Sequence, residues 1–99
     1  MLDRIVAAIQ SKDASAQIYL FGSRARGDNR SDSDWDILIL LDVTEVTDNI
    51  EVPFRDEISK IEHQTGQIIS VFIYSFDFWK NNLKSTALYK IVEKDGIKL

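Results

Sequence analysis

The sequence predicts an α+β sandwich, in which a small mixed β-sheet carries helices packed on it. Short runs rich in β-branched and aromatic residues alternate with segments whose apolar residues recur at helical spacing. Turn-forming residues separate these segments, and no linker, repeat or low-complexity stretch interrupts them. A chain of 99 residues suits one domain, so residues 1–99 are expected to fold as a single unit.

The first half of the chain predicts two strands that flank a polar turn. The second of these strands becomes apolar on both faces after Asp36, so we expect it to be central and covered. The two strands are close in sequence and can lie side by side. The predicted elements are a helix over 2–12, a strand over 17–21, a helical turn over 23–27, a loop over 28–33 and a strand over 34–41.

A longer helix and a third strand follow. Apolar residues at helical spacing begin at Ile50 and continue to Ile61, with Pro53 expected in the first turn and Gly66 at the end. Residues 67–74 are rich in isoleucine, valine and phenylalanine, which predicts a strand.

Two short helices are expected at the C-terminal end. Ser75 or Asp77 is the expected cap of the first, which runs through Leu83. Ser85 is expected to cap the second, which ends near Gly96. Three strands with helices between them give the sandwich stated above.

Composition excludes several classes of protein. The net charge of −4 argues against nucleic acid as the main partner, because gripping a phosphate backbone usually needs a basic face. The absence of cysteine excludes disulfides and zinc–thiolate sites. The longest apolar run, Ile37 to Leu41, is far too short to span a bilayer, and the first residues resemble an amphipathic helix and not a signal peptide. We therefore expect a cytoplasmic protein without a membrane partner.

Two carboxylates, Asp34 and Asp36, stand at alternate positions where the second strand begins. Alternate residues of a strand point to the same face, and two carboxylates on one face can hold one or two hard cations. Such pairs are also common as solubilising acids at a strand entry. A metal site is favoured here because a glycine-serine turn lies only a short distance upstream and can reach the same edge of the sheet.

That turn, Gly22-Ser23, has the residue types of an anion site. Glycine lets a phosphate approach the backbone, and serine adds a hydroxyl beside the free N–H groups of a helix start. The same pair also occurs in ordinary strand-to-helix turns. Arg24 and Arg26 are either solvated surface charges or guanidinium groups that offset phosphate charge. Metal and phosphate together suggest a nucleoside triphosphate.

The whole segment resembles the signature of the minimal nucleotidyltransferase (MNT) branch of the DNA polymerase β-like nucleotidyltransferase superfamily. That pattern runs Gly-Ser, Arg-x-Arg-Gly, a short spacer and Ser-Asp-x-Asp. It is met here by Gly22, Ser23, Arg24, Arg26, Gly27, Ser33, Asp34 and Asp36.

The resemblance implies roles for these residues. Asp34 and Asp36 would be the catalytic carboxylates that hold Mg²⁺ or Mn²⁺, and the phosphates of ATP or another nucleoside triphosphate would meet the Gly22-Ser23 turn. The reaction would be nucleotidyl transfer with loss of pyrophosphate, AMP being the expected group. The remaining nucleotide-binding residues that the motif implies are Arg24, Arg26 and Ser33.

One feature departs from the family pattern. Active members usually add a third carboxylate from a neighbouring strand, which by position is 67–74, but this run contains no acid. Ser70 stands where the acid is expected. Asp42 lies about 20 Å along the strand from Asp36 and cannot replace it.

Two functions from different classes follow. The first is an enzyme that moves AMP onto a hydroxyl of a small molecule or a protein, as the antitoxin of an MNT–HEPN pair with a HEPN-type helical protein as its partner. The second is a nucleotide-binding module that neutralises or regulates a partner by contact. The intact pair Asp34 and Asp36 favours the enzyme, and Ser70 favours the module. The acceptor and the oligomeric state stay open.

Overall fold

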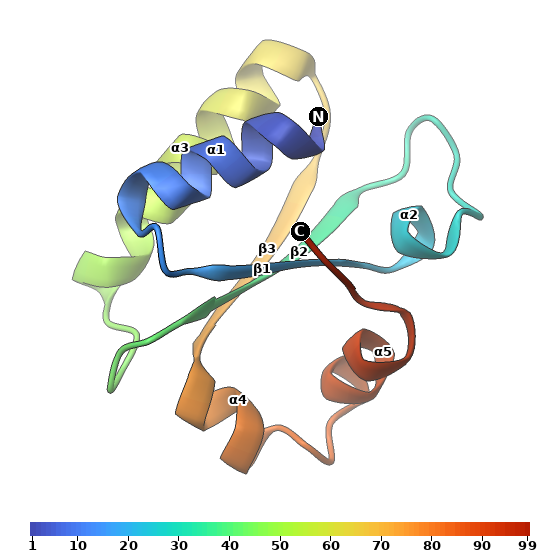
Figure 1. Ribbon diagram of the computed structural model, residues 1–99. Coiled ribbons are helices and arrows are strands. Elements are labelled where there is room, and N and C mark those ends of the chain that lie inside the picture. The colour runs from blue at the N-terminus through green and yellow to red at the C-terminus, as the bar shows by residue number, and fades with distance from the viewer.

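The computed structural model describes residues 1–99 and contains a four-stranded sheet with the strand order β3-β2-β1-β4. Helices pack on both faces of this sheet (Figure 1). The elements in chain order are α1 (Leu2–Lys12), β1 (Gln17–Phe21), α2 (Ser23–Arg26), β2 (Trp35–Leu41), α3 (Asp48–Thr65), β3 (Ile69–Ser75), α4 (Phe76–Asn82), α5 (Ala87–Asp95) and β4 (Ile97–Lys98).

The sheet is mixed, as the sequence predicts. Strands β1 and β2 are antiparallel with Phe21 opposite Asp36, whereas β2 and β3 are parallel with Asp36 opposite Ser70. The short strand β4 pairs antiparallel with β1 and was not predicted. A segment of two residues is too short to show the alternation on which strand prediction depends.

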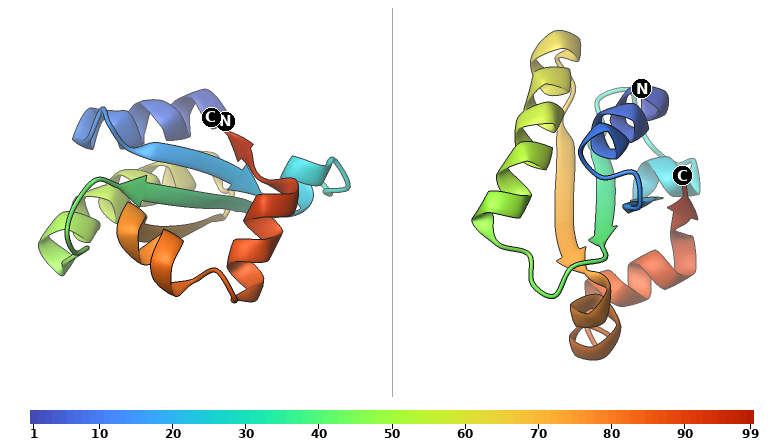
Figure 2. Two further views of the ribbon diagram at one scale, coloured as in Figure 1. Left: turned by 60° about the horizontal axis from the view of Figure 1, so that its bottom comes forward. Right: turned by 60° about the vertical axis from the view of Figure 1, so that its left-hand side comes forward.

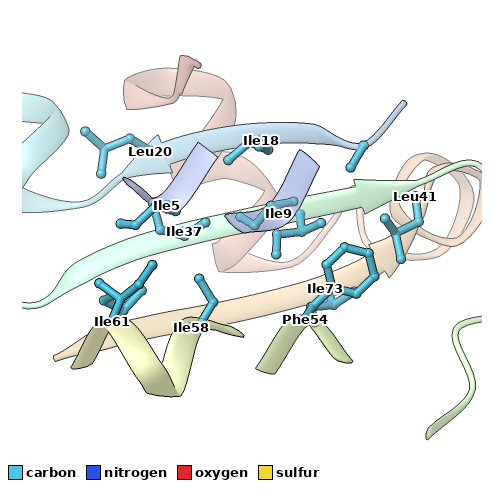
Figure 3. Packing of buried hydrophobic residues seen from close by; sticks show 13 residues of the cluster. Ile5, Ile9, Ile18, Leu20, Ile37, Leu41, Phe54, Ile58, Ile61 and Ile73 are labelled. Carbon is cyan, nitrogen blue, oxygen red and sulfur yellow. The ribbon is translucent and has the colours of Figure 1, made fainter. Parts of the chain in front are cut away.

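The larger core lies between the sheet and the helices α1 and α3 (Figure 3). Its residues are apolar and almost free of solvent contact, with Ile5, Ile9 and Ile37 fully buried. Because α1 and α3 lie side by side over one face, the apolar stripe of each helix meets the inward residues of three strands. The site described below lies at the edge of the sheet where β1 ends and β2 begins.

The opposite face of the sheet carries α4 and α5 (Figure 2). Phe21, Leu38 and Trp79 are buried there, and the rings of Phe21 and Phe72 lie 5.7 Å apart between centroids. Since side chains alternate along a strand, Asp36 shares this face with Leu38. Asp36 therefore lies on the side of the sheet that carries α4 and α5.

Some predicted boundaries were wrong. Helix α3 begins at Asp48, so Pro53 lies inside the helix and not in its first turn; the early residues of this helix are polar and hide its start from the apolar pattern. Helix α5 is capped by Thr86 and not by Ser85, because the Thr86 hydroxyl accepts from the N–H of Tyr89. Ser75 does cap α4, by accepting from the N–H of Phe78.

The observed strand boundaries also differ slightly from the predicted ones. β2 begins at Trp35, which leaves Asp34 outside the strand, and β3 begins at Ile69 and not at residue 67. The N–H of Trp35 donates to the carbonyl of Ile68 at 2.9 Å, the first backbone bond that joins the two strands. No helix in the structure is long and apolar enough to cross a bilayer.

Candidate active site

Gly22 is the hinge between β1 and α2, and the Asp36 carboxylate lies directly against it. Its backbone has φ 76° and ψ −158°, a conformation that L side chains rarely adopt. A Cβ atom at this position would collide with Oδ2 of Asp36. Glycine is therefore required twice, by the backbone conformation and by the neighbouring carboxylate.

Asp34 joins Asp36 at the same edge. It is exposed and precedes the first residue of β2, and its Oδ2 accepts a hydrogen bond of 3.4 Å from the hydroxyl of Ser70. Ser70 lies opposite Asp36 in the parallel pairing of β2 and β3. The structure thus brings together the two predicted carboxylates and the serine that stands in place of a third.

The electrostatics of this edge are unfavourable without a cation. The pKa of the Asp36 carboxyl is raised, first by partial burial and then by the charge of Asp34, while the guanidinium of Arg26 acts in the opposite direction. A divalent cation between the carboxylates would remove this repulsion. Carboxylate and hydroxyl oxygens are hard ligands, so the donor set fits Mg²⁺ or Mn²⁺.

The site has two carboxylates and no more. Nowhere in the chain do three or more His, Cys, Asp or Glu residues gather in a way that would hold a metal ion. A cation here would take its remaining ligands from water and phosphate, which is the usual situation of Mg²⁺ at nucleotide sites.

Ser23 opens the helix α2, directly after the hinge. The first N–H groups of a helix have no intrahelical acceptor, and the carbonyl of Gly22 already receives the N–H groups of Ala25 and Arg26. The backbone donors at Ser23 and Arg24 are therefore the ones left for an anion. Figure 1 shows α2 at the end of the sheet where β2 begins, which is the end that carries the acids.

Arg24 lies against the loop that follows α2. Its Nε and Nη2 donate to the carbonyl of Ser33 at 3.0 and 2.9 Å, and Nη2 also donates to the carbonyl of Ser31 at 3.1 Å. The guanidinium lies 3.9 Å from the centroid of the Trp35 ring. In this arrangement the Nε and Nη2 donors of Arg24 are occupied by the loop.

Arg26 connects the motif to the C-terminal helix. It forms an ion pair of 3.1 Å with Asp28 and a longer one of 3.7 Å with Asp95 at the end of α5. The hydrogen bond with Asp28 is the largest cause of its raised pKa. Its charge also reaches Asp36, whose pKa it lowers against the effects of burial and of Asp34.

Ser33 shapes the loop before the acids. Its hydroxyl accepts from the backbone N–H of Arg30 at 2.9 Å, and its carbonyl accepts from Arg24. Both of its oxygens are thus engaged within the chain. The motif predicts nucleotide contacts for Ser33 and for the arginines; the geometry adds internal contacts for all three.

Trp35 is the residue that sequence reasoning missed. It occupies the variable position between the two aspartates, carries the guanidinium of Arg24 on its ring and donates from Nε1 to the side chain of Gln67. A large aromatic residue between two charged positions was the available signal. The pairing of Arg26 with Asp95 gave no signal, because the two residues are far apart in sequence.

The comparison with protein families decides the classification. A model described as "Nucleotidyltransferase domain" matches residues 2–99. The chain belongs to the nucleotidyltransferase domain family. The match covers almost the whole chain, so the family assignment includes the hinge, the acids and both helical layers.

Solved structures show the same fold. A crystal structure of a toxin–antitoxin with AMP-PNP is 20% identical with a TM-score of 0.68, over 97% of this chain and 69% of that chain. A mutant of the toxin–antitoxin MntA-HpeT is also 20% identical with a TM-score of 0.68, over 100% of this chain and 71% of that chain. The search of curated proteins found no match. The nucleotidyltransferase fold thus places Asp34 and Asp36 on the scaffold that the sequence predicted.

Proposed function

We propose that this chain is a divalent-metal-dependent nucleotidyltransferase that moves AMP from ATP onto a hydroxyl of a partner protein. The observation that carries the proposal is the contact of the Asp36 carboxylate with the Gly22 hinge, where no side chain is tolerated. The Asp36 carboxylate, which we propose as a metal ligand, thus lies beside the backbone donors of the turn. A cation and the phosphates it accompanies would then share one edge of the sheet.

Several residues of the motif have a part in this proposal. The N–H groups at the start of α2 and the hydroxyl of Ser23 would donate to phosphate oxygens. Arg26 would add positive charge near the acids, since its field already reaches Asp36. A divalent cation held by the two carboxylates would supply charge to the attacking and leaving oxygens.

The proposed reaction is a displacement at the α-phosphorus of ATP. The acceptor oxygen forms a bond to this phosphorus, and the bond from the phosphorus to the oxygen bridging the β-phosphate breaks. Pyrophosphate leaves with the electron pair of that bond. The proton of the acceptor hydroxyl passes to water or to a base of the partner, because the neutral Ser70 hydroxyl is not a base and donates its hydrogen bond to Asp34.

We further propose that the partner is a HEPN-type helical protein and that the chain acts as the antitoxin of the pair. Support comes from the fold neighbours, which are toxin–antitoxin structures, one of them with AMP-PNP. In this proposal the acceptor hydroxyl belongs to that partner protein.

A labelling experiment tests this proposal. The chain and the protein encoded beside it are incubated with Mg²⁺ and with ATP labelled on either the α- or the γ-phosphate. We expect the α-label to appear on the protein encoded beside this chain. Transfer should be lost in Asp34→Asn and in Asp36→Asn. It should stay normal in Asp32→Asn, which changes an exposed acid of the same loop. Transfer of the γ-label, or transfer that survives both site substitutions, would exclude the proposed reaction.

A second function is favoured by Ser70. With a hydroxyl in place of a third carboxylate, the chain would bind Mg-ATP and regulate its partner by contact without turnover. Nucleotide binding, label transfer and neutralisation of the partner together distinguish the two functions. If Mg-ATP binds, no α-label moves and Asp36→Asn still neutralises the partner, the chain is a binding module and not an enzyme.

A further inference from the structure

Asp34 has little to hold it in place. It is exposed, it precedes β2, and the backbone bonds that join β2 to β3 begin only at Trp35. Its one side-chain hydrogen bond is the long one of 3.4 Å from Ser70. Something else must fix the backbone on which this carboxylate stands.

Arg24 contacts the chain on both sides of Asp34. On one side, its guanidinium donates two hydrogen bonds to the carbonyl of Ser33, at 3.0 and 2.9 Å, and a third to Ser31. On the other side, the same group lies 3.9 Å from the centre of the Trp35 ring. The residues directly before and after Asp34 are therefore both held by one side chain.

We propose that Arg24 is a positioning residue that fixes Asp34 for metal binding, and that this is its role in place of direct phosphate contact. The inference rests on the proposed function, since it needs Asp34 to be a metal ligand. The donors of the guanidinium that face the loop are occupied by backbone carbonyls. The guanidinium whose charge acts on the Asp36 carboxylate is that of Arg26.

The two roles predict opposite effects on cation affinity. If Arg24 acted through its charge, its removal would leave the acidic edge more negative, and a cation would bind as tightly as before or more tightly. If Arg24 fixes Asp34, its removal frees the loop and weakens cation binding. Groups that orient a metal ligand typically change affinity by about 10–100-fold when they are removed.

Lysine separates shape from charge at this position. Arg24→Lys keeps the positive charge but cannot donate to two carbonyls and lie flat on an aromatic ring at the same time. A positioning role therefore predicts that Arg24→Lys resembles Arg24→Ala. A phosphate-contact role predicts that lysine keeps most of the nucleotide affinity.

The test measures binding of Mn²⁺ alone, without nucleotide, by electron paramagnetic resonance of the free ion. We expect Arg24→Ala and Arg24→Lys to weaken binding at least about tenfold, while Arg30→Ala leaves it unchanged. Arg30 is the matched control because its exposed side chain lies in the same loop and only its backbone makes hydrogen bonds there. Hydrogen exchange should become faster over residues 28–34 in the Arg24 variants, with the thermal transition retained.

Two results would overturn the inference: Mn²⁺ affinity that is unchanged or higher in Arg24→Ala, or wild-type affinity in Arg24→Lys. If Arg24→Ala does not fold, Arg24→Lys and Trp35→Leu decide the question, since the leucine removes the ring under the guanidinium. Asp34→Asn distinguishes this failure from that of the proposed function. Loss of Mn²⁺ in Asp34→Asn with no effect of Arg24→Lys refutes only the inference, whereas no Mn²⁺ binding by the wild type refutes the metal site itself and the inference with it.

Discussion

Substitution of Gly22 by alanine tests the hinge and its contact with Asp36 together. The backbone at φ 76° and ψ −158° lies in a region that is essentially limited to glycine, and a residue held there costs about 1–3 kcal/mol. The added Cβ also collides with Oδ2 of Asp36, and forced overpacking costs about 1–3 kcal/mol. We expect a total loss of about 2–6 kcal/mol in the free energy of unfolding, a large share of the roughly 5–15 kcal/mol of a small domain.

Gly27→Ala is the matched control. Gly27 also has a positive φ, 84°, but no atom lies within 4 Å of a Cβ built there. The left-handed conformation alone costs about 1–2 kcal/mol. Urea unfolding of the two variants therefore separates backbone strain from collision, and Gly22→Ala should be the less stable by at least about 1 kcal/mol.

A double-mutant cycle isolates the collision. In a chain that already carries Asp36→Ala the colliding carboxylate is absent, so Gly22→Ala should cost only its backbone strain. Equal stability losses for Gly22→Ala with and without Asp36, or for Gly22→Ala and Gly27→Ala, would refute the reasoning. The Asp36 carboxylate would then not lie against the hinge in solution.

Three further predictions concern the same edge. Ser70→Asp should tighten Mn²⁺ binding, because a third anionic ligand joins Asp34 and Asp36, and titration of the free ion checks this; unfolding without any gain in affinity would contradict it. Ser23→Ala should weaken Mg-ATP binding by about 0.5–1.5 kcal/mol in calorimetry with little change in the melting temperature, whereas a large melting loss at unchanged affinity would make Ser23 structural. The pKa of Asp36 is raised in the folded state, so proton binding to Asp36 stabilises the fold at pH values below its pKa in the unfolded chain, about 3.9. This stabilisation is lost as the pH rises through the pKa of the folded state. Metal-free Asp36→Asn should therefore gain stability over the wild type across that window in urea titrations at stepped pH, and a loss there would contradict the sign.

Local patterns carried most of the fold prediction. The strand β2, the helix α1 and the cap at Ser75 follow from residues close in sequence, and the structure contains all three. The start of α3 and the cap at Thr86 were mispredicted because polar residues at a helix start fit several registers equally well.

Sequence predicted the part of the candidate site whose residues are close together along the chain. Gly22 and the two aspartates belong to one β-hairpin, so their spacing along the chain fixes their meeting in space. The contacts of Arg24 depend on the path of an irregular loop, which no periodic pattern encodes. The ion pair of Arg26 with Asp95 depends on where α5 ends, and nothing in the motif points to it.

Two separate parts of the chain supply the residues of the proposed site. The hinge and both carboxylates come from β1, β2 and the turn between them, whereas the third position, Ser70, comes from β3 by way of the long helix α3. The hydroxyl of Ser70 contacts Asp34 but takes no part in the hinge. A change at Ser70 would therefore alter the ligand set of a bound metal and the acceptor available for a proton. The turn that would hold phosphate would stay intact. We therefore expect the proposed transfer and the proposed nucleotide binding to be separable, with Ser70→Asp shifting transfer and metal affinity more than affinity for ATP.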